Sequence, residues 1–209
     1  MFGKTNNIHF VGIGGIGMSG MAELLYKLGF NISGSDLNRS ERTDNLKEIG
    51  LTISEGHSQN NVNGADVVVY SSAVQQDNPE IVAARKKQVP VIRRAEMLAE
   101  LLKVKPTSIA ISGTHGKTTT CSMLGEILTT AELSPTMVIG GIVNKFQSNT
   151  ISGSGNVIVV EFKAAQIFHS RKRAKVINLI VAQLQPFKFC QTAKRIDVMD
   201  FVLPKVQPL

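Results

Sequence analysis

The chain has few cysteines, no long apolar run and no glycine after Gly155. Its two cysteines, Cys121 and Cys190, are far apart. Their spacing excludes a cysteine-rich metal module and fits a reduced, cytoplasmic compartment. The apolar runs are far shorter than the ~20 residues that cross a bilayer, so we expect no membrane segment. Because a strand-like run begins almost at the N-terminus, we also expect no signal peptide.

The excess of positive charge is confined to one end of the chain. The net charge is +7, yet residues 1–161 hold 14 basic and 14 acidic residues, whereas residues 162–209 hold 9 and 2. We interpret the basic cluster at 171–175 as solvated charge and expect no nucleic-acid partner. The loss of both glycine and charge balance indicates that the chain changes character near Glu161.

Residues 8–36 have the pattern of a βαβ unit. An apolar run is followed by Gly12-Ile-Gly-Gly-Ile-Gly17, then by a segment with apolar residues at helical spacing, and then by a second strand that ends at Asp36. Glycines at the start of a helix let phosphates approach its N-terminus, and an acid at this distance commonly contacts a ribose. The pattern predicts a nucleotide-binding Rossmann-like domain. Glycines that serve only tight packing are the alternative.

The alternation of strands and helices continues to about residue 102. Asn78-Pro79 predicts a helix start, with Asn as the N-cap and Pro at the first helical position. Such an alternation predicts a parallel sheet with helices on both faces and ligands at the carboxyl ends of its strands. The further elements predicted are strands at 52–54, 65–70 and 89–92 and helices at 43–49, 79–87 and 94–102.

Residues 108–120 predict a second nucleotide site. A buried strand at 109–111 leads through Gly113-Thr-His-Gly116 to Lys117-Thr118 and a helical segment. Backbone N–H groups and Lys117 would hold phosphates, and the Thr118 hydroxyl would reach Mg²⁺. Only two residues separate the glycines, where the usual nucleotide loop has four. A glycine turn with a solvated lysine is therefore the alternative.

Further strands are predicted at 135–139 and 156–160, after a linker at 103–106. The last strand ends in Glu161, whose carboxylate would bind Mg²⁺ beside the phosphate loop. An ordinary solvated strand end is the alternative. A sheet this short is expected to leave an edge and one face uncovered.

Several motifs in order resemble the Mur ligases, the ATP-dependent amino-acid ligases of peptidoglycan synthesis. Within that family, His115 points to the member that acts on UDP-N-acetylmuramate. The resemblance also implies that the first domain holds a UDP-sugar and not NAD. The motifs are residues 8–22, 33–36, 56–57, 71–74, 94–98, 113–120 and 157–161.

The resemblance implies amide formation: ATP phosphorylates the carboxylate of UDP-N-acetylmuramate, and the amine of L-alanine then displaces phosphate. Lys117 would be the catalytic residue, and Thr118 and Glu161 would hold Mg²⁺. The residues implied for ATP are Gly113, Thr114, His115, Gly116, Lys117, Thr118 and Thr119. Those implied for the UDP-sugar are Gly14, Gly15, Ile16, Gly17, Asp36, His57, Ser71, Ser72 and Arg94.

The predicted organisation is α/β, with a Rossmann-like UDP-sugar domain at 1–103 and an incomplete ATPase domain at 107–161. The resemblance stops at Glu161, because Lys163 stands where the family has an acid. We interpret residues 162–209 as a frameshifted or disordered tail and expect a truncated, inactive ligase. A UDP-sugar-binding module without catalysis and an NAD-binding protein are the alternatives.

Overall fold

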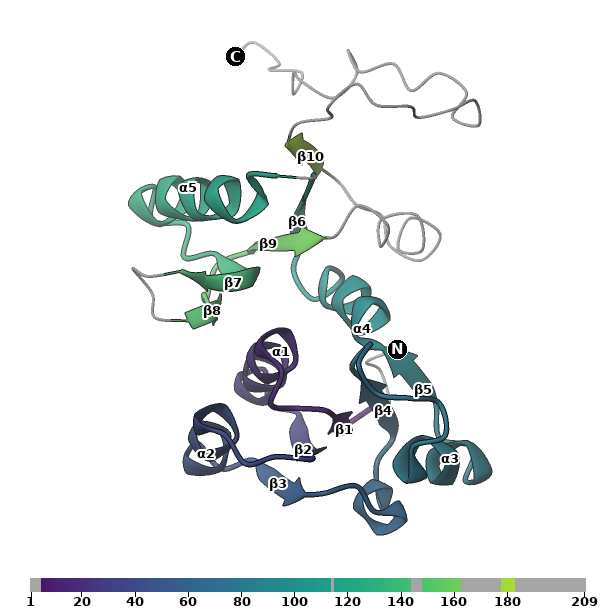
Figure 1. Cartoon of the computed structure of the whole chain (residues 1–209). Coiled ribbons are helices and arrows are strands. Elements are labelled where there is room, and N and C mark those ends of the chain that lie inside the picture. Colours follow the sequence, from purple (N-terminus) through teal and green to yellow (C-terminus); the bar gives the residue numbers. More distant parts are fainter. Residues whose placement is uncertain (1–4, 114, 144–147, 163–177, 183–209) are drawn as a thin grey trace, which may run out of the picture.

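The computed structural model describes residues 5–113, 115–143, 148–162 and 178–182, and it contains two five-stranded sheets (Figure 1). Each sheet is built mainly from parallel strands connected by helices, as the alternation of elements predicted. No helix in these ranges is long and apolar enough to cross a membrane.

The first sheet is entirely parallel and has the strand order β3-β2-β1-β4-β5. β1 lies at its centre, between β2 and β4, and all four residues of β4 are buried. The strands are β1 (Asn7–Val11), β2 (Asn31–Asp36), β3 (Thr52–Glu55), β4 (Val67–Tyr70) and β5 (Val91–Arg93). The helices are α1 (Ile16–Lys27), α2 (Glu41–Glu48), α3 (Pro79–Lys86) and α4 (Arg94–Leu101), with a short 3₁₀ turn η1 (Gln59–Val62).

Local capping starts two of these helices, and the sequence predicted the cap of α3 but not that of α2. The Asn78 side chain accepts a hydrogen bond from the Glu80 N–H, and Pro79 occupies the first position of α3. At the start of α2, the Thr43 N–H donates to the Ser40 hydroxyl oxygen, and the Ser40 N–H donates to the Thr43 hydroxyl oxygen. These bonds satisfy N–H groups that have no partner within a helix.

The second sheet has the order β10-β6-β9-β7-β8, in which β8 alone runs antiparallel to its neighbour. One helix, α5 (Lys117–Thr130), follows the phosphate loop and packs on one face. Side chains alternate along the strands, so that Met137 and Val159 face α5, whereas Val138 and Ile158 face the other way. The strands are β6 (Thr107–Gly113), β7 (Thr136–Val143), β8 (Ser148–Ile151), β9 (Val157–Phe162) and β10 (Asn178–Ala182).

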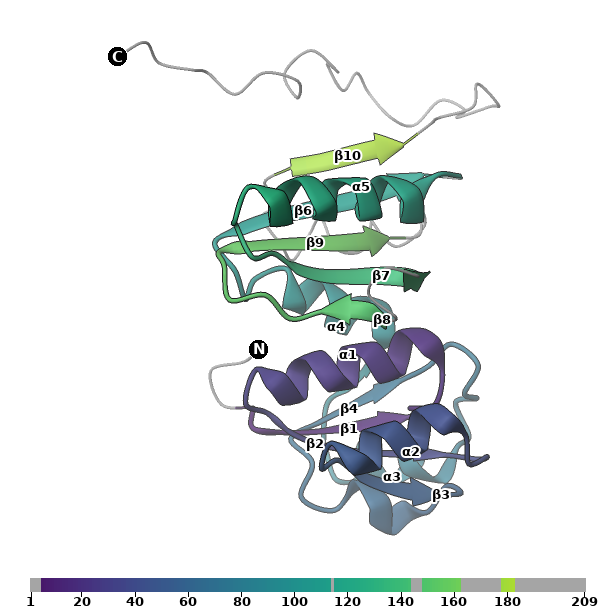
Figure 2. The ribbon, with the colours of Figure 1, turned by 90° about the vertical axis from the view of Figure 1, so that its left-hand side faces the viewer.

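The second face of this sheet is covered, contrary to the prediction. α1 lies between the two sheets, and α4 lies in the same layer (Figure 2). Met21 of α1 and Leu98 of α4 share one buried cluster with Val138 and Ile158. At the edge, the Asn149 side chain of β8 donates to the Ile16 carbonyl at 2.6 Å. The first half of the chain therefore supplies part of the core of the second sheet.

The predicted strands and helices of residues 8–161 are all present, with ends shifted by a few residues. The short elements η1 and β8 had no clear pattern in the sequence. β10 belongs to the predicted tail, and five of its residues pair in parallel with β6. The remainder of that tail, residues 163–177 and 183–209, lies outside the described residues.

Candidate functional site

The glycine loop is held against the carboxyl end of β2. The N–H groups of Gly12 and Ile13 donate to the Ser35 carbonyl at 2.8 and 3.0 Å. The Gly14 N–H donates to the Asp36 carboxylate at 2.8 Å, and the Gly56 N–H donates to the Asp36 carbonyl at 2.7 Å. Asp36 thus ties together the loop after β1 and the loop after β3, with its carboxylate already engaged by the glycine loop.

The other predicted UDP-sugar residues of this loop lie at the same edge. Gly15 and Ile16 are exposed at the start of α1, where backbone N–H groups attract anions. At the end of β4, a Cβ on Gly12 would lie 3.2 Å from the Ser71 Cβ, and Ser72 is exposed beside it. The structure therefore gathers Gly14 to Gly17, Asp36, Ser71 and Ser72 at the carboxyl ends of adjacent strands.

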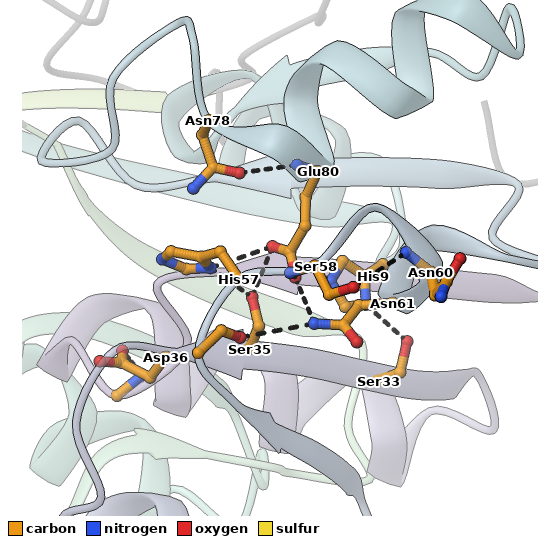
Figure 3. Close-up of polar contacts among 12 residues, drawn as sticks. His9, Ser33, Ser35, Asp36, His57, Ser58, Asn60, Asn61, Asn78 and Glu80 are labelled. Carbon is orange, nitrogen blue, oxygen red and sulfur yellow. Dashed lines mark hydrogen bonds and ion pairs between the residues drawn. The ribbon is translucent and has the colours of Figure 1, made fainter.

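His57 is mostly buried, with 11% of its side chain exposed, and it is not a loop histidine in solvent. Its Nδ1 lies 3.0 Å from the Ser35 hydroxyl and 3.2 Å from a Glu80 carboxylate oxygen. Ser35 donates to the same carboxylate at 2.6 Å, and Asn61 donates to its other oxygen at 2.6 Å (Figure 3). These contacts fix the His57 ring at the carboxyl end of β2.

Glu80 is fully buried at the first turn of α3, and its surroundings nevertheless favour the ionised carboxylate. Burial by itself would raise the pKa of Glu80, but the neighbouring His9 ring and hydrogen bonds from Ser35 and Asn61 lower it to about 2. His9 Nε2 is 3.7 Å from the carboxylate, and its Nδ1 contacts the Ser33 hydroxyl at 2.9 Å. The N-terminal end of a helix also favours a negative charge.

Arg94 connects the two predicted nucleotide sites. Its guanidinium occupies the space beside Gly17 so closely that a Cβ there would overlap it. Burial lowers the pKa of Arg94, and the negative charge of Glu161 opposes that shift. This half-buried cation from α4 thus lies beside the start of α1 and within electrostatic range of Glu161 at the end of β9.

The phosphate loop has the geometry that its residue types predict. Gly116 has φ +75° with open space around its Cβ position, so that the chain turns into α5 without a side chain in the way. Lys117 Nζ donates to the Gly113 carbonyl at 2.9 Å. His115 and Thr119 are exposed on the loop and the first turn of α5. Thr114 lies outside the described residues.

Thr118 and Glu161 come together as predicted for a metal site. The Thr118 hydroxyl donates to a Glu161 carboxylate oxygen at 3.0 Å, and the Gly140 N–H donates to the same oxygen at 2.9 Å. In the described ranges no three His, Cys, Asp or Glu side chains gather as a metal cage. A hydroxyl and one carboxylate fit Mg²⁺, which usually takes few protein ligands and completes its shell with phosphate and water oxygens.

Cys121 is not part of this site. It is fully buried in the cluster between α5 and the sheet. Burial raises the pKa of Cys121 to about 12, with a further rise from Glu161 and an opposing effect of Lys117. The thiol therefore packs as a small apolar group and is not activated by the nearby helix N-terminus.

The residues that surround His57 were not predicted from the sequence. Glu80 has the position of an ordinary acid in the first turn of a helix, and His9 interrupts an otherwise apolar strand. The only signal was that an inward-facing position in the middle of β1 carried a histidine, which needs a polar partner when it is buried.

Comparisons with known proteins agree with this arrangement. Residues 7–106 match the Mur ligase family, catalytic domain. Over 161 residues, 77% of this chain, the sequence is 56% identical to UDP-N-acetylmuramate–L-alanine ligase of Geotalea daltonii. The corresponding ligase of Syntrophus aciditrophicus is 55% identical over 158 residues. This chain spans about a third of the length of these relatives, 35% and 33%.

The fold is similar to solved structures of such ligases. UDP-N-acetylmuramate-alanine ligase from Thermotoga maritima superposes with a TM-score of 0.73 and 39% identity, covering 84% of this chain and 40% of that one. UDP-N-acetylmuramate:L-alanyl-gamma-D-glutamyl-meso-diaminopimelate ligase from Neisseria meningitides gives 0.68 and 28%, covering 75% and 52%.

Proposed function

Because the chain belongs to the Mur ligase family, we propose that it carries the UDP-sugar and ATP sites of a cytoplasmic enzyme that joins L-alanine to UDP-N-acetylmuramate. The observation that carries this proposal is the contact between Thr118, after the phosphate loop, and Glu161 at the end of β9, with Arg94 beside the first glycine loop at Gly17 and within electrostatic range of Glu161. A ligase needs the sugar and the nucleotide triphosphate within reach of each other.

In this proposal the diphosphate of the sugar binds the exposed backbone N–H groups at the start of α1. Lys117 turns from the Gly113 carbonyl to the outer phosphates of ATP. Thr118 and Glu161 hold Mg²⁺, which when bound neutralises phosphate charge. Arg94 offsets the negative charge of the sugar carboxylate and the transferred phosphoryl group. His115 and Thr119 line the entrance of the ATP site.

For the 209-residue chain itself, we propose nucleotide binding without ligase turnover. The similarity covers 161 and 158 residues here, which amount to 35% and 33% of the matched relatives. Assays for phosphate release in the presence of UDP-N-acetylmuramate, L-alanine and ATP test this directly. Release that requires both substrates, at about 1 s⁻¹ or faster, would contradict it.

Calorimetric titration with UDP-N-acetylmuramate and with NAD tests the identity of the first site. We expect the UDP-sugar to bind and NAD to bind weakly or not at all. Tighter binding of NAD would favour the dinucleotide alternative and overturn the proposal.

The ATP site is tested by Lys117→Ala with Cys121→Ala as the matched control. Both residues lie on α5, but only Lys117 carries a charge near the loop, whereas Cys121 is buried in the core. We expect Lys117→Ala to weaken ATP binding roughly tenfold or more, the scale of one charge-assisted hydrogen bond, and Cys121→Ala to have little effect. Equal losses would count against the phosphate loop.

A further inference from the structure

The turn between η1 and β4 contains the single Asn-Gly dipeptide of the chain, Asn63-Gly64. The Ala65 N–H donates to the Val62 carbonyl at 3.3 Å and closes a four-residue turn. Asn63 has φ −68° and ψ 127°, and Gly64 has φ +79°. These angles are those of a type II turn, whose third residue needs a positive φ and is therefore commonly glycine. Both central residues are exposed to solvent.

The backbone nitrogen of Gly64 is open to its surroundings. The hydrogen bond of a β-turn joins its first and fourth residues, so the Gly64 N–H takes no part in it. Among the residues that the structure describes, none accepts a hydrogen bond from this N–H. A Cβ built on Gly64 would meet nothing within 4 Å. Gly64 thus presents an unhindered nitrogen directly after the side-chain amide of Asn63.

The side-chain carbonyl of Asn63 is polarised by a cation. Lys87, at the C-cap of α3, donates from Nζ to Asn63 Oδ1. When a nitrogen attacks Asn63 Cγ, negative charge develops on Oδ1, and an ammonium group at that oxygen stabilises it. Both side chains are exposed, so solvent weakens this stabilisation without removing it. The contact therefore favours attack on Cγ.

We propose that Asn63 is a site of spontaneous deamidation that Lys87 promotes. A base removes the Gly64 amide proton, the Gly64 nitrogen bonds to Asn63 Cγ, and the bond between Cγ and Nδ2 breaks. The side-chain nitrogen leaves as ammonia with the proton that the Gly64 nitrogen gave up, and a five-membered succinimide remains. Solvent water then opens the ring at either carbonyl, which gives aspartate or isoaspartate at position 63. No oxidant or reductant takes part.

The two products change the turn differently. Aspartate keeps the backbone and places a carboxylate beside the Lys87 ammonium. Isoaspartate routes the main chain through Cγ, which lengthens the turn by one carbon and breaks its closing hydrogen bond. The sheet is anchored directly after this turn, because the Asp66 carboxylate accepts from the Asn6 and Asn7 N–H groups at 2.8 Å. The isoaspartate form should therefore melt at a lower temperature than the unmodified chain.

The reaction is followed by peptide mass spectrometry of the folded full chain, kept at neutral pH and physiological temperature. Asn60 is the internal control, because it is exposed and lies on the same tryptic peptide as Asn63. The nitrogen that would attack Asn60 belongs to Asn61, which has a side chain and whose N–H donates to the Ser58 carbonyl at 3.0 Å. We expect loss of the Asn63 amide while Asn60 stays intact. Methylation by an isoaspartyl methyltransferase, used as a reagent, detects the isoaspartate product.

Three variants separate the chemistry from the surface charge. Asn63→Gln keeps an amide but would have to close a six-membered ring, and we expect no conversion. Lys87→Gln should slow the loss of the Asn63 amide by about two- to fivefold, the scale of an exposed charge contact. Arg85→Gln is the matched control, because it removes a cation from the same end of α3 that contacts Gln76, and it should keep the wild-type rate.

Four results would contradict the proposal. An Asn63 amide that persists in the folded chain but is lost in denaturant would show that the turn protects the dipeptide. Equal conversion of Asn60 would refute a site-specific reaction. A wild-type rate in Lys87→Gln, or an equal slowing in Arg85→Gln, would overturn the role of Lys87. These measurements use no nucleotide, so they stand whether or not the proposed function holds.

Discussion

The two sheets obtain their cores in different ways. The first is covered by helices from its own half of the chain. The second, within the part of the chain that the structure describes, has α5 as its own helix and takes its other cover from α1 and α4. The outer side of α5, on the second sheet, also leaves large apolar residues uncovered: Met123 and Ile127 are 63% and 64% exposed. The predicted linker at 103–106 separates the two predicted nucleotide-binding units in the sequence, but it does not divide the core, because α1 and α4 pack against both sheets.

The two carboxylates near the predicted sites, Glu80 and Glu161, also differ in how completely the protein surrounds them. Glu80 in the first half is enclosed, and both of its oxygens are occupied by protein donors. Glu161 in the second half is at a strand end, where Thr118 and Gly140 share one of its oxygens. The first carboxylate holds a neighbouring side chain in place, whereas the second keeps one oxygen without a hydrogen-bond donor among the described residues, as the proposed magnesium site requires.

Separating the two halves of the chain should cause the largest loss of structure. A fragment of residues 107–209 lacks α1 and α4, and it would expose Val138, Ile158 and the rest of that face. We expect no cooperative thermal transition by circular dichroism. The fragment 1–103 should fold, with lower stability than in the whole chain, and adding it should restore structure to 107–209. Cooperative melting of 107–209 alone would show that the two cores are independent.

Replacing one methionine on each face of the second sheet with alanine tests whether the two sheets share a core. Met21→Ala in the shared layer should cost about 2–5 kcal/mol and reduce hydrogen-exchange protection in both sheets. Met137→Ala, in the cluster under α5, should cost a similar amount but reduce protection mainly in the second sheet. Identical exchange patterns for the two variants would contradict a core that is shared through α1.

Glu80 should make the first half sensitive to acid. Its carboxyl titrates at 4.5 in the unfolded chain and at about 2 when folded. Above pH 4.5 the stabilisation is fully present. As the pH falls toward 2, the unfolded chain binds a proton that the folded one does not, and about 3 kcal/mol is lost. Denaturant unfolding between pH 5 and 2 should show a smaller decline in Glu80→Gln than in the wild-type chain.

The matched control for this measurement is Glu48→Gln, which removes an exposed carboxylate at the end of α2. It should keep the wild-type decline between pH 5 and 2. If Glu80→Gln also kept the full decline, the buried carboxylate would not be the source of the acid sensitivity.

The order of elements and the glycine loops could be predicted from the sequence because they depend on local rules of periodicity, capping and loop residues. The pairing of Thr118 with Glu161 followed from adjacent strands ending at one edge. The partners of His57 could not be predicted, since an acid at the start of α3 has no periodic signal that tells inward from outward. The cover on the second sheet was not predicted. The helix α1 has apolar residues on two sides, and it was expected to pack only on the first sheet.

Cys121 gives the smallest expected effect, and it tests how tightly α5 closes its face of the second sheet. Burial raises its pKa from 9.0 to about 12, so at pH 8 the folded chain holds about a thousandfold less thiolate than the unfolded one. In a Cys190→Ser background, we expect iodoacetamide to label Cys121 only in denaturant. The raised pKa also predicts that stability is unaffected below pH 9 and falls as the pH rises toward 12, because the unfolded thiol ionises first. Rapid labelling of the native chain at pH 8, with unchanged circular dichroism, would mean that α5 opens frequently and that the second sheet is covered firmly only on the side of α1.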